Sequence, residues 1–152
     1  MSNISSKTRL RIITPARQIF DKEVDMVSIR TPLGERGILP GHAPMVCALV
    51  DSVVDIKIGS ELIKASVMSG FAEISGKLIT IVSDVAEWPD EIDVERAQES
   101  LEHAQRIIES GTGRDAIEAA KRDLQRAKIR LEVSKYKSAA EEAKKASGVK
   151  VE

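Results

Sequence analysis

The sequence predicts a two-domain α+β protein. Residues 1–87 form an N-terminal antiparallel β-sandwich of about ten strands, and residues 88–152 a C-terminal antiparallel two-helix hairpin. All five prolines and six of the nine glycines fall within residues 1–89. Charged side chains occupy 20 of the first 87 residues but 27 of the remaining 65. Short β-prone runs recur about every ten residues before this break, and apolar residues at helical spacing follow it.

The predicted strands are short and bounded by turn residues. The clearest covers 54–58, where three aliphatic side chains alternate with Asp55 and Lys57, as in a strand that buries one face. The scarcity of aromatic residues, 3% of the chain, means that the sandwich core is aliphatic. The other predicted strands include residues 9–14, 24–29, 62–67, 71–74 and 78–82, with hairpin turns at Gly59-Ser60 and Ser75-Gly76.

Residues 31–44 stand out because they contain three prolines and three glycines. Proline fixes φ and glycine supplies positive φ, so this composition predicts a rigid, shaped loop. The stretch lacks the GxxxxGK[ST] phosphate-loop pattern, and GxGxxG occurs nowhere in the chain. Composition alone favours a structural connection between strands over a binding loop.

The second domain begins with Asp93, a favourable N-cap, and its first helix ends before Gly111. A second helix begins between residues 112 and 115. Each helix is predicted to carry one narrow apolar seam and a charged outer face. The seam positions are Val94, Ala97, Leu101, Ala104 and Ile108 on the first helix, and Ile117, Ala120, Leu124, Ala127, Leu131 and Ser134 on the second.

Alanine occupies four of these seam positions. Burying an alanine stabilises the contact by about 2 kcal/mol less than burying a leucine, so the hairpin is held lightly. Periodicity leaves a stable appendage and a mobile one equally open.

Basic side chains on the second helix alternate with acidic ones, a composition typical of a solvated face. Arg122, Arg126 and Arg130 nevertheless recur every four residues, which places them in a row about 6 Å apart. Such a row could meet an acidic partner or a polyphosphate.

Several classes of function are disfavoured. A net charge of -1 argues against a charge-driven nucleic-acid partner, and no apolar run approaches the roughly 20 residues of a membrane span. Cys47 alone allows no intramolecular disulfide, and the polar pair Glu141-Glu142 offers no tuned acid or base. His42 and His103 lie in different segments, so we expect no metal site. No nucleophile–base arrangement is visible, and we expect no catalytic residues. The start of the chain shows no signal or transit pattern.

Three motifs occur in one order: residues 34–44 (GERGILPGHAP), residues 69–74 (SGFAEI) and residues 92–97 (IDVERA). Together they resemble the epsilon-subunit family of bacterial F-type ATP synthases, over about residues 8–136. The loop similar to GxLPGHAP is the most specific part of the resemblance. In that family the N-terminal domain is a ten-stranded β-sandwich and the C-terminal domain is a two-helix hairpin.

The resemblance implies a non-catalytic central-stalk subunit that couples ion-driven rotation to ATP synthesis. Its partners would be the gamma subunit and the c-ring, with the catalytic alpha/beta head as a further partner when the hairpin extends and inhibits ATP hydrolysis. The implied location is peripheral, on the cytoplasmic face of the bacterial cell membrane. Glu35 and His42 match the family's rotor-interface positions, although Arg36 departs from the leucine more usual there.

The resemblance also implies ATP as a regulatory ligand, with no cofactor required for function. Tight-binding relatives carry a further arginine at the position of His103. The replacement of that arginine by histidine is expected to weaken phosphate binding. Without the family, Asp93 is an N-cap and Arg96 a solvated first-turn residue. The competing interpretation is a free-standing β-sandwich adaptor that dimerises through its helical arm. The positions matched to the family's ATP contacts are Glu87, Ile92, Asp93, Arg96, Ala97, Arg126 and Arg130.

Overall fold

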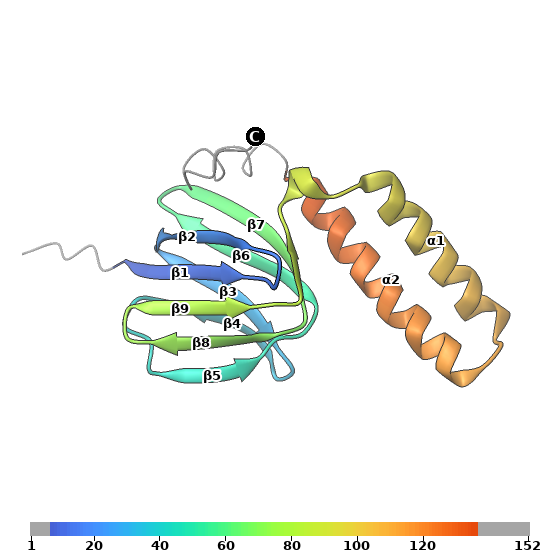
Figure 1. Cartoon of the computed structure of the whole chain (residues 1–152), viewed down its shortest axis with the longest axis horizontal. Helices are drawn as coiled ribbons and strands as arrows, with labels where there is room; N and C mark the ends of the chain where they lie inside the picture. Colours follow the sequence, from blue (N-terminus) through green and yellow to red (C-terminus); the bar gives the residue numbers. More distant parts are fainter. Residues whose placement is uncertain (1–6, 137–152) are drawn as a thin grey trace, which may run out of the picture.

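The computed structural model describes residues 7–136, which form ten strands, a short 3₁₀ turn and two helices (Figure 1). The predicted polar tail beyond Tyr136, with Glu141 and Glu142, lies outside this range. The strands are β1 (Thr8–Ile13), β2 (Gln18–Val24), β3 (Met26–Thr31), β4 (Gly34–Ile38), β5 (Met45–Ala48), β6 (Ser52–Ile58), β7 (Glu61–Met68), β8 (Phe71–Ser75), β9 (Leu78–Val82) and β10 (Val85–Glu87), followed by η1 (Pro89–Glu91), α1 (Val94–Ser110) and α2 (Arg114–Ser134).

The strands form two five-stranded sheets packed face to face, which confirms the predicted sandwich. The first sheet has the order β2-β1-β9-β8-β5 and the second has the order β10-β7-β6-β3-β4. Their inner faces meet in an aliphatic core, as in β6, where Val54 and Ile56 are fully buried while Asp55 and Lys57 point outward. The core includes Leu10, Ile12, Phe20, Val27, Ile38, Ile63, Ile79 and Ile81.

Two features of the sandwich differ from the prediction. β1 pairs with β9 in parallel, because these strands are distant in the chain and no tight turn sets their relative direction. Residues 31–44 also contain β4, so the prediction of one rigid loop was wrong. The prolines and glycines instead lie largely in the turns that flank β4. In the second turn, the His42 N–H donates to the Leu39 carbonyl at 3.2 Å and Gly41 takes a φ of 83°, the geometry that Pro-Gly favours.

The helices begin and end where the sequence indicates. The Asp93 carboxylate accepts a hydrogen bond from the Arg96 backbone N–H at 3.0 Å, and Gly111 adopts the left-handed conformation with a φ of 67°. The two seams face each other within the chain. The alanine positions of the seams are buried, at Ala97, Ala104, Ala120 and Ala127.

α2 also carries a second apolar stripe, which the prediction of one seam per helix missed. Ile129 and Val133 pack with Met68 and Ile92 in a small cluster on the outer face of the second sheet. α2 therefore contacts β6, β7 and η1, while α1 packs chiefly against α2 and lies farther from the sandwich (Figure 1). This arrangement docks the hairpin on the sandwich through one helix.

The segment that joins the domains is fixed to the sandwich. Trp88 is buried, and its ring lies 5.8 Å from that of Phe20 between centroids. The Trp88 backbone N–H donates to the Glu91 carboxylate at 2.9 Å, and Glu91 also forms an ion pair with Arg17. The chain is thus anchored up to Ile92, one residue before the N-cap of α1. Neither helix in residues 7–136 has the length and hydropathy needed to cross a membrane.

Candidate functional site

A pocket of about 310 Å³ lies where the start of α1, the end of α2 and the last strand of the sandwich meet. Arg96 points from the first turn of α1 and Arg130 from α2, so two guanidinium groups come from different helices. The Asp93 carboxylate is engaged as the N-cap of α1. The lining residues are Glu87, Glu91, Asp93, Arg96, Ala97, Ser100 and Arg130.

A second pocket of about 280 Å³ continues from the first, because Ser100 and Arg130 line both. It adds His103 from α1 and Arg126 from α2. The two pockets together present three arginines along one groove between the helices. Guanidinium groups donate paired hydrogen bonds to phosphate oxygens, and carboxylates accept them from hydroxyl groups. The arrangement can therefore hold a ligand that carries both phosphates and hydroxyls.

Two of these arginines already pair with carboxylates of the sandwich. The Arg130 Nε donates to Glu87 at 2.8 Å, and the Arg126 Nε donates to Asp51 at 2.7 Å. The hydrogen bond and charge of Asp51 raise the pKa of Arg126 above its ordinary value, against the effect of burial. Arg96 has no ion pair among the described residues.

The arginine row on α2 is therefore a solvated face only in part. Arg122 is exposed, whereas Arg126 and Arg130 flank the apolar stripe of Ile129 and Val133 and reach the sheet. The four-residue spacing of these arginines allowed an acidic partner, and for Arg126 and Arg130 that partner is a carboxylate of the same chain. These charge pairs border the apolar contact that docks α2.

Most of the residues matched to the ATP motif come together here. Glu87, Asp93, Arg96, Ala97 and Arg130 line the first pocket, which leaves two of the matched positions outside it. Arg126 lines the second pocket. The Ile92 side chain is only 6% exposed and packs in the small cluster beneath α2.

The two predicted rotor-interface residues lie elsewhere. Glu35 is on β4 and accepts a hydrogen bond from the Ser28 hydroxyl at 2.6 Å. His42 follows the turn after β4, with its Nδ1 2.7 Å from the Ala43 carbonyl oxygen. Neither residue lines the pockets between the helices.

Sequence reasoning missed some residues that shape the site. Asp51, the partner of Arg126, lies 75 residues away in the sequence, and no local pattern links the two. Ser100 belongs to the polar face of α1 and carries no motif. Among residues 7–136, no His, Cys, Asp and Glu side chains gather in threes as metal ligands do.

Two family models together match nearly all of the described chain. Residues 7–89 match the beta-sandwich domain of the delta/epsilon chain of ATP synthase, and residues 90–135 match its long alpha-helix domain. The ATP synthase epsilon chain of Alkaliphilus metalliredigens is 38% identical over 134 residues, which cover 88% of this chain and all of that one. The epsilon chain of Bacillus mycoides is 39% identical over 126 residues, covering 83% and 95%.

Solved structures give the same picture. A chain of the Euglena gracilis mitochondrial ATP synthase, in a structure of OSCP, F1 and c-ring, superposes with a TM-score of 0.74 at 25% identity, covering 86% of this chain and 82% of that one. A chain from the central stalk and c-ring of the Tetrahymena thermophila mitochondrial enzyme has a TM-score of 0.58 at 13% identity, covering 84% and 96%. The second likeness concerns the fold alone.

Proposed function

The chain belongs to the delta/epsilon family of ATP synthase subunits, and from this premise we propose that it is a non-catalytic subunit of the central stalk of an F-type ATP synthase. In this role the sandwich binds the gamma subunit and the c-ring and helps to couple ion-driven rotation to ATP synthesis. The protein is peripheral, on the cytoplasmic face of the cell membrane.

Exposed apolar side chains around β4 and on β5 support the rotor interface. Leu33, Leu39 and Val46 are 90%, 58% and 70% exposed, and they lie on the turns around β4 and on β5. Large aliphatic side chains left exposed around one strand are available for contact with a partner protein. Glu35 and His42 belong to the same part of the chain, and we assign them to the c-ring contact. Tight turns on both sides of β4 limit the ordering that assembly requires.

The hairpin is the regulatory element of the proposal. The observation that carries it is the groove between the helices, because residues from the sandwich, α1 and α2 all line it only while the hairpin is docked. A ligand bound there stabilises the docked state, by about 1.4 kcal/mol at ten times its dissociation constant. When the hairpin leaves the sandwich it becomes free to reach the alpha/beta head and inhibit ATP hydrolysis.

We assign ATP as that ligand. Arg96, Arg126 and Arg130 are the candidate phosphate-binding groups, and Glu87 and Asp93 are the candidate acceptors for hydroxyl groups. Ile92 and Ala97 support these side chains from the apolar side of the motif. His103 lacks the paired guanidinium donors of the arginine that tight-binding relatives carry at this position, so we expect weak binding.

The test begins with the isolated chain, labelled with a fluorescent donor on the sandwich and an acceptor on the hairpin. ATP should produce a saturable increase in the docked population, and Arg96→Ala should weaken this response about tenfold or more, whereas Arg106→Ala, an exposed change on α1 outside both pockets, should not. Equal responses of the two variants would refute the ATP assignment. Co-purification with the gamma subunit and the catalytic head tests the stalk role separately, and a stable homodimer that ignores gamma would refute it.

A further inference from the structure

Residues 88–92 join the two domains, and we refer to them as the strap. The Trp88 side chain is 2% exposed and belongs to the sandwich core rather than to the small cluster beneath α2. Pro89 is buried as well, and its ring fixes its own φ. A residue that precedes proline is restricted to extended conformations, and Trp88 has a ψ of 158°. The first two residues of the strap therefore have little freedom to rotate.

A charged clamp, formed by Arg17 and Glu91, holds the far end of the 3₁₀ turn. The Glu91 backbone N–H donates to the Trp88 carbonyl at 3.0 Å, and the Glu91 carboxylate accepts the Trp88 N–H at 2.9 Å. The same carboxylate pairs with Arg17, in the turn between β1 and β2. That turn is closed by Thr14, whose N–H donates to the Arg17 carbonyl at 2.9 Å and whose hydroxyl accepts the Arg17 N–H at 3.2 Å. A closed turn of the first sheet thus ties the strap to the sandwich.

α1 begins directly after the strap, and Asp93 is already bound to it. The Asp93 carbonyl accepts the Ala97 N–H at 3.0 Å, and the Asp93 carboxylate accepts the Arg96 N–H at 3.0 Å. Ile92 has φ and ψ of -79° and 123°, and Asp93 has -77° and 99°, so both residues are extended. Rotation about Ile92 ψ and Asp93 φ turns the peptide unit between them and leaves both the 3₁₀ turn and the cap of α1 intact.

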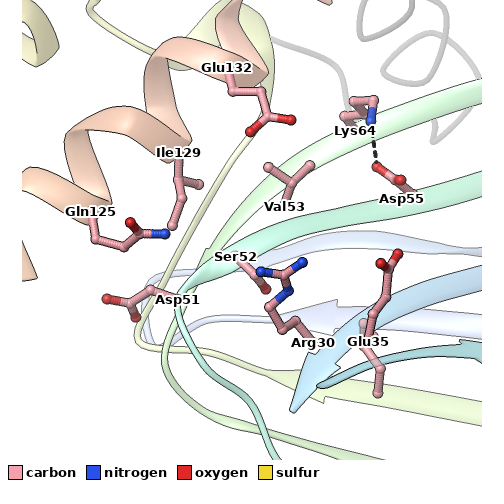
Figure 2. A pocket seen from close by; sticks show the side chains of 11 residues that line it. Arg30, Glu35, Asp51, Ser52, Val53, Asp55, Lys64, Gln125, Ile129 and Glu132 are labelled. Carbon is pink, nitrogen blue, oxygen red and sulfur yellow. Dashed lines mark hydrogen bonds and ion pairs between the residues drawn. The ribbon is translucent and has the colours of Figure 1, made fainter. Parts of the chain in front are cut away.

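The contact of α2 with the second sheet is less complete than the attachment of the strap. A pocket of about 260 Å³ separates part of α2 from the outer face of the sheet, so the helix is not close-packed along its length (Figure 2). The apolar contact is confined to a cluster of four buried residues, and Figure 2 shows one of them, Ile129, on the side of α2 that faces Val53 of β6. When the hairpin leaves, this contact opens before the strap does.

We propose that the hairpin pivots about the peptide unit between Ile92 and Asp93, beyond the change in composition at residues 87–88, while the strap stays on the sandwich in the docked and undocked states. The inference rests on the proposed departure of the hairpin and not on ATP binding. Met68 and Ile92 are the members of the small cluster that remain on the sandwich, whereas Ile129 leaves with α2.

The pivot divides the groove between the helices into two parts. Glu87 and Glu91 lie before it and stay with the sandwich, whereas Arg96 and Arg130 lie beyond it and leave with the hairpin. The clamp keeps Glu91 in place after the hairpin has left. The sandwich therefore retains a preformed acidic wall to which the two arginines return on docking.

The experiment uses Trp88, the only tryptophan of the chain, as a reporter of the strap. Ile129→Glu in the full chain places a charge in the small cluster and undocks the hairpin, which the donor and acceptor labels report as a longer distance. On unlabelled Ile129→Glu protein we expect Trp88 to keep the emission maximum and the acrylamide quenching of the parent protein. Gln125→Glu adds the same charge at an exposed position of α2 and should leave the hairpin docked.

The two readouts separate the possible failures. A red-shifted and readily quenched Trp88 in a protein whose labels have moved apart would overturn the pivot, since the strap would then leave with the hairpin. Labels that stay together in Ile129→Glu would refute the departure of the hairpin itself, and the pivot with it.

The clamp is tested by hydrogen exchange of the Trp88 backbone N–H in the Ile129→Glu background. Arg17→Gln should speed this exchange by about two- to fivefold, because losing an exposed ion pair shifts a local opening equilibrium by a factor of this size. Arg36→Gln removes the same charge from an exposed position on β4 and should leave the rate unchanged. Equal rates in the Arg17 and Arg36 variants would overturn the role of the clamp.

Discussion

Truncation of Ile129 should undock the hairpin while leaving both domains folded. Ile129 is 4% exposed and packs with Met68, Ile92 and Val133 in the small cluster between α2 and the sandwich. Replacement by alanine removes roughly three methylene-sized groups, which costs about 2–3 kcal/mol including part of the cavity term. The docked-to-undocked ratio should therefore fall about 30- to 150-fold. The neighbouring ion pairs, each of about 0.2–1 kcal/mol, offset little of this loss.

The assay measures the distance between the domains directly. With Cys47 replaced by serine, spin labels at Glu61, the first residue of β7, and at Thr112, between the helices, report the docked state as a single narrow distance distribution. Ile129→Ala should broaden and lengthen that distribution. Far-UV circular dichroism should retain the helical signal, because the α1–α2 seam does not include Ile129.

Ile117→Ala is the matched control. It removes the same atoms from α2 at a partly buried seam position near the link between the helices. It should loosen the hairpin internally without increasing the distance between the domains. An unchanged distance distribution in Ile129→Ala would refute the argument. A loss in the unfolding free energy of the sandwich as large as the loss in the docking free energy would also refute it.

Three further outcomes follow from the contacts. Asp51→Asn should weaken docking by up to about 1 kcal/mol at low salt and by less at high salt, measured with the same labels. The hydrogen bond from Arg9 lowers the pKa of Asp21, so this carboxylate stabilises the fold above its ordinary pKa and loses the effect as it becomes protonated. The difference in unfolding free energy between the parent protein and Asp21→Asn should therefore shrink from pH 6 to pH 3. Gly70→Ala should cost at least about 2–3 kcal/mol in urea unfolding, because its φ is +115° and a Cβ would lie 2.0 Å from a carbonyl oxygen of the neighbouring strand. Gly76→Ala, with a φ of +59° but open space, should cost about 1 kcal/mol.

Each of these outcomes has a contrary result. Docking of Asp51→Asn that does not depend on salt would show that the ion pair contributes nothing to it. A constant difference between pH 6 and pH 3 would remove Asp21 from the acid response. Equal losses in the two glycine variants would mean that backbone conformation alone, rather than the close approach at Gly70, sets the cost.

The fold was predictable because its patterns are local. Alternation in β6, the cap at Asp93 and the glycine at 111 each act within a few residues, and the structure confirms them. The errors concern contacts between distant segments. Residues 31–44 became a turn, a strand and a turn because β3 offers β4 a pairing edge, which composition does not reveal. The parallel pairing of β1 with β9 is also set by the assembled sheet.

The candidate site was predictable only in part, for the same reason. The family motif indicated residues that the structure gathers around one groove. It gave no sign that Asp51 and Glu87 hold Arg126 and Arg130 in the absence of ligand. The second stripe on α2 also escaped notice, because Ile129 and Val133 lie within a helix whose charge suggested a solvated face. Two apolar residues on a charged helix can be recognised as a packing contact only when the sheet that they pack against is known.

The pairing of the arginines bears on how ligand binding and docking are linked. Lining the groove are three arginines and four acids, Glu87, Glu91, Asp93 and Asp123. A polyphosphate that binds there must compete with Asp51 for Arg126 and with Glu87 for Arg130. Part of its binding energy therefore replaces contacts that already dock the hairpin, and only Arg96, unpaired within residues 7–136, contributes a wholly new interaction. The net stabilisation by ATP is then smaller than its number of arginine contacts suggests. On this reasoning Asp51→Asn has two opposed effects, since it weakens docking without ligand and releases Arg126 to a phosphate.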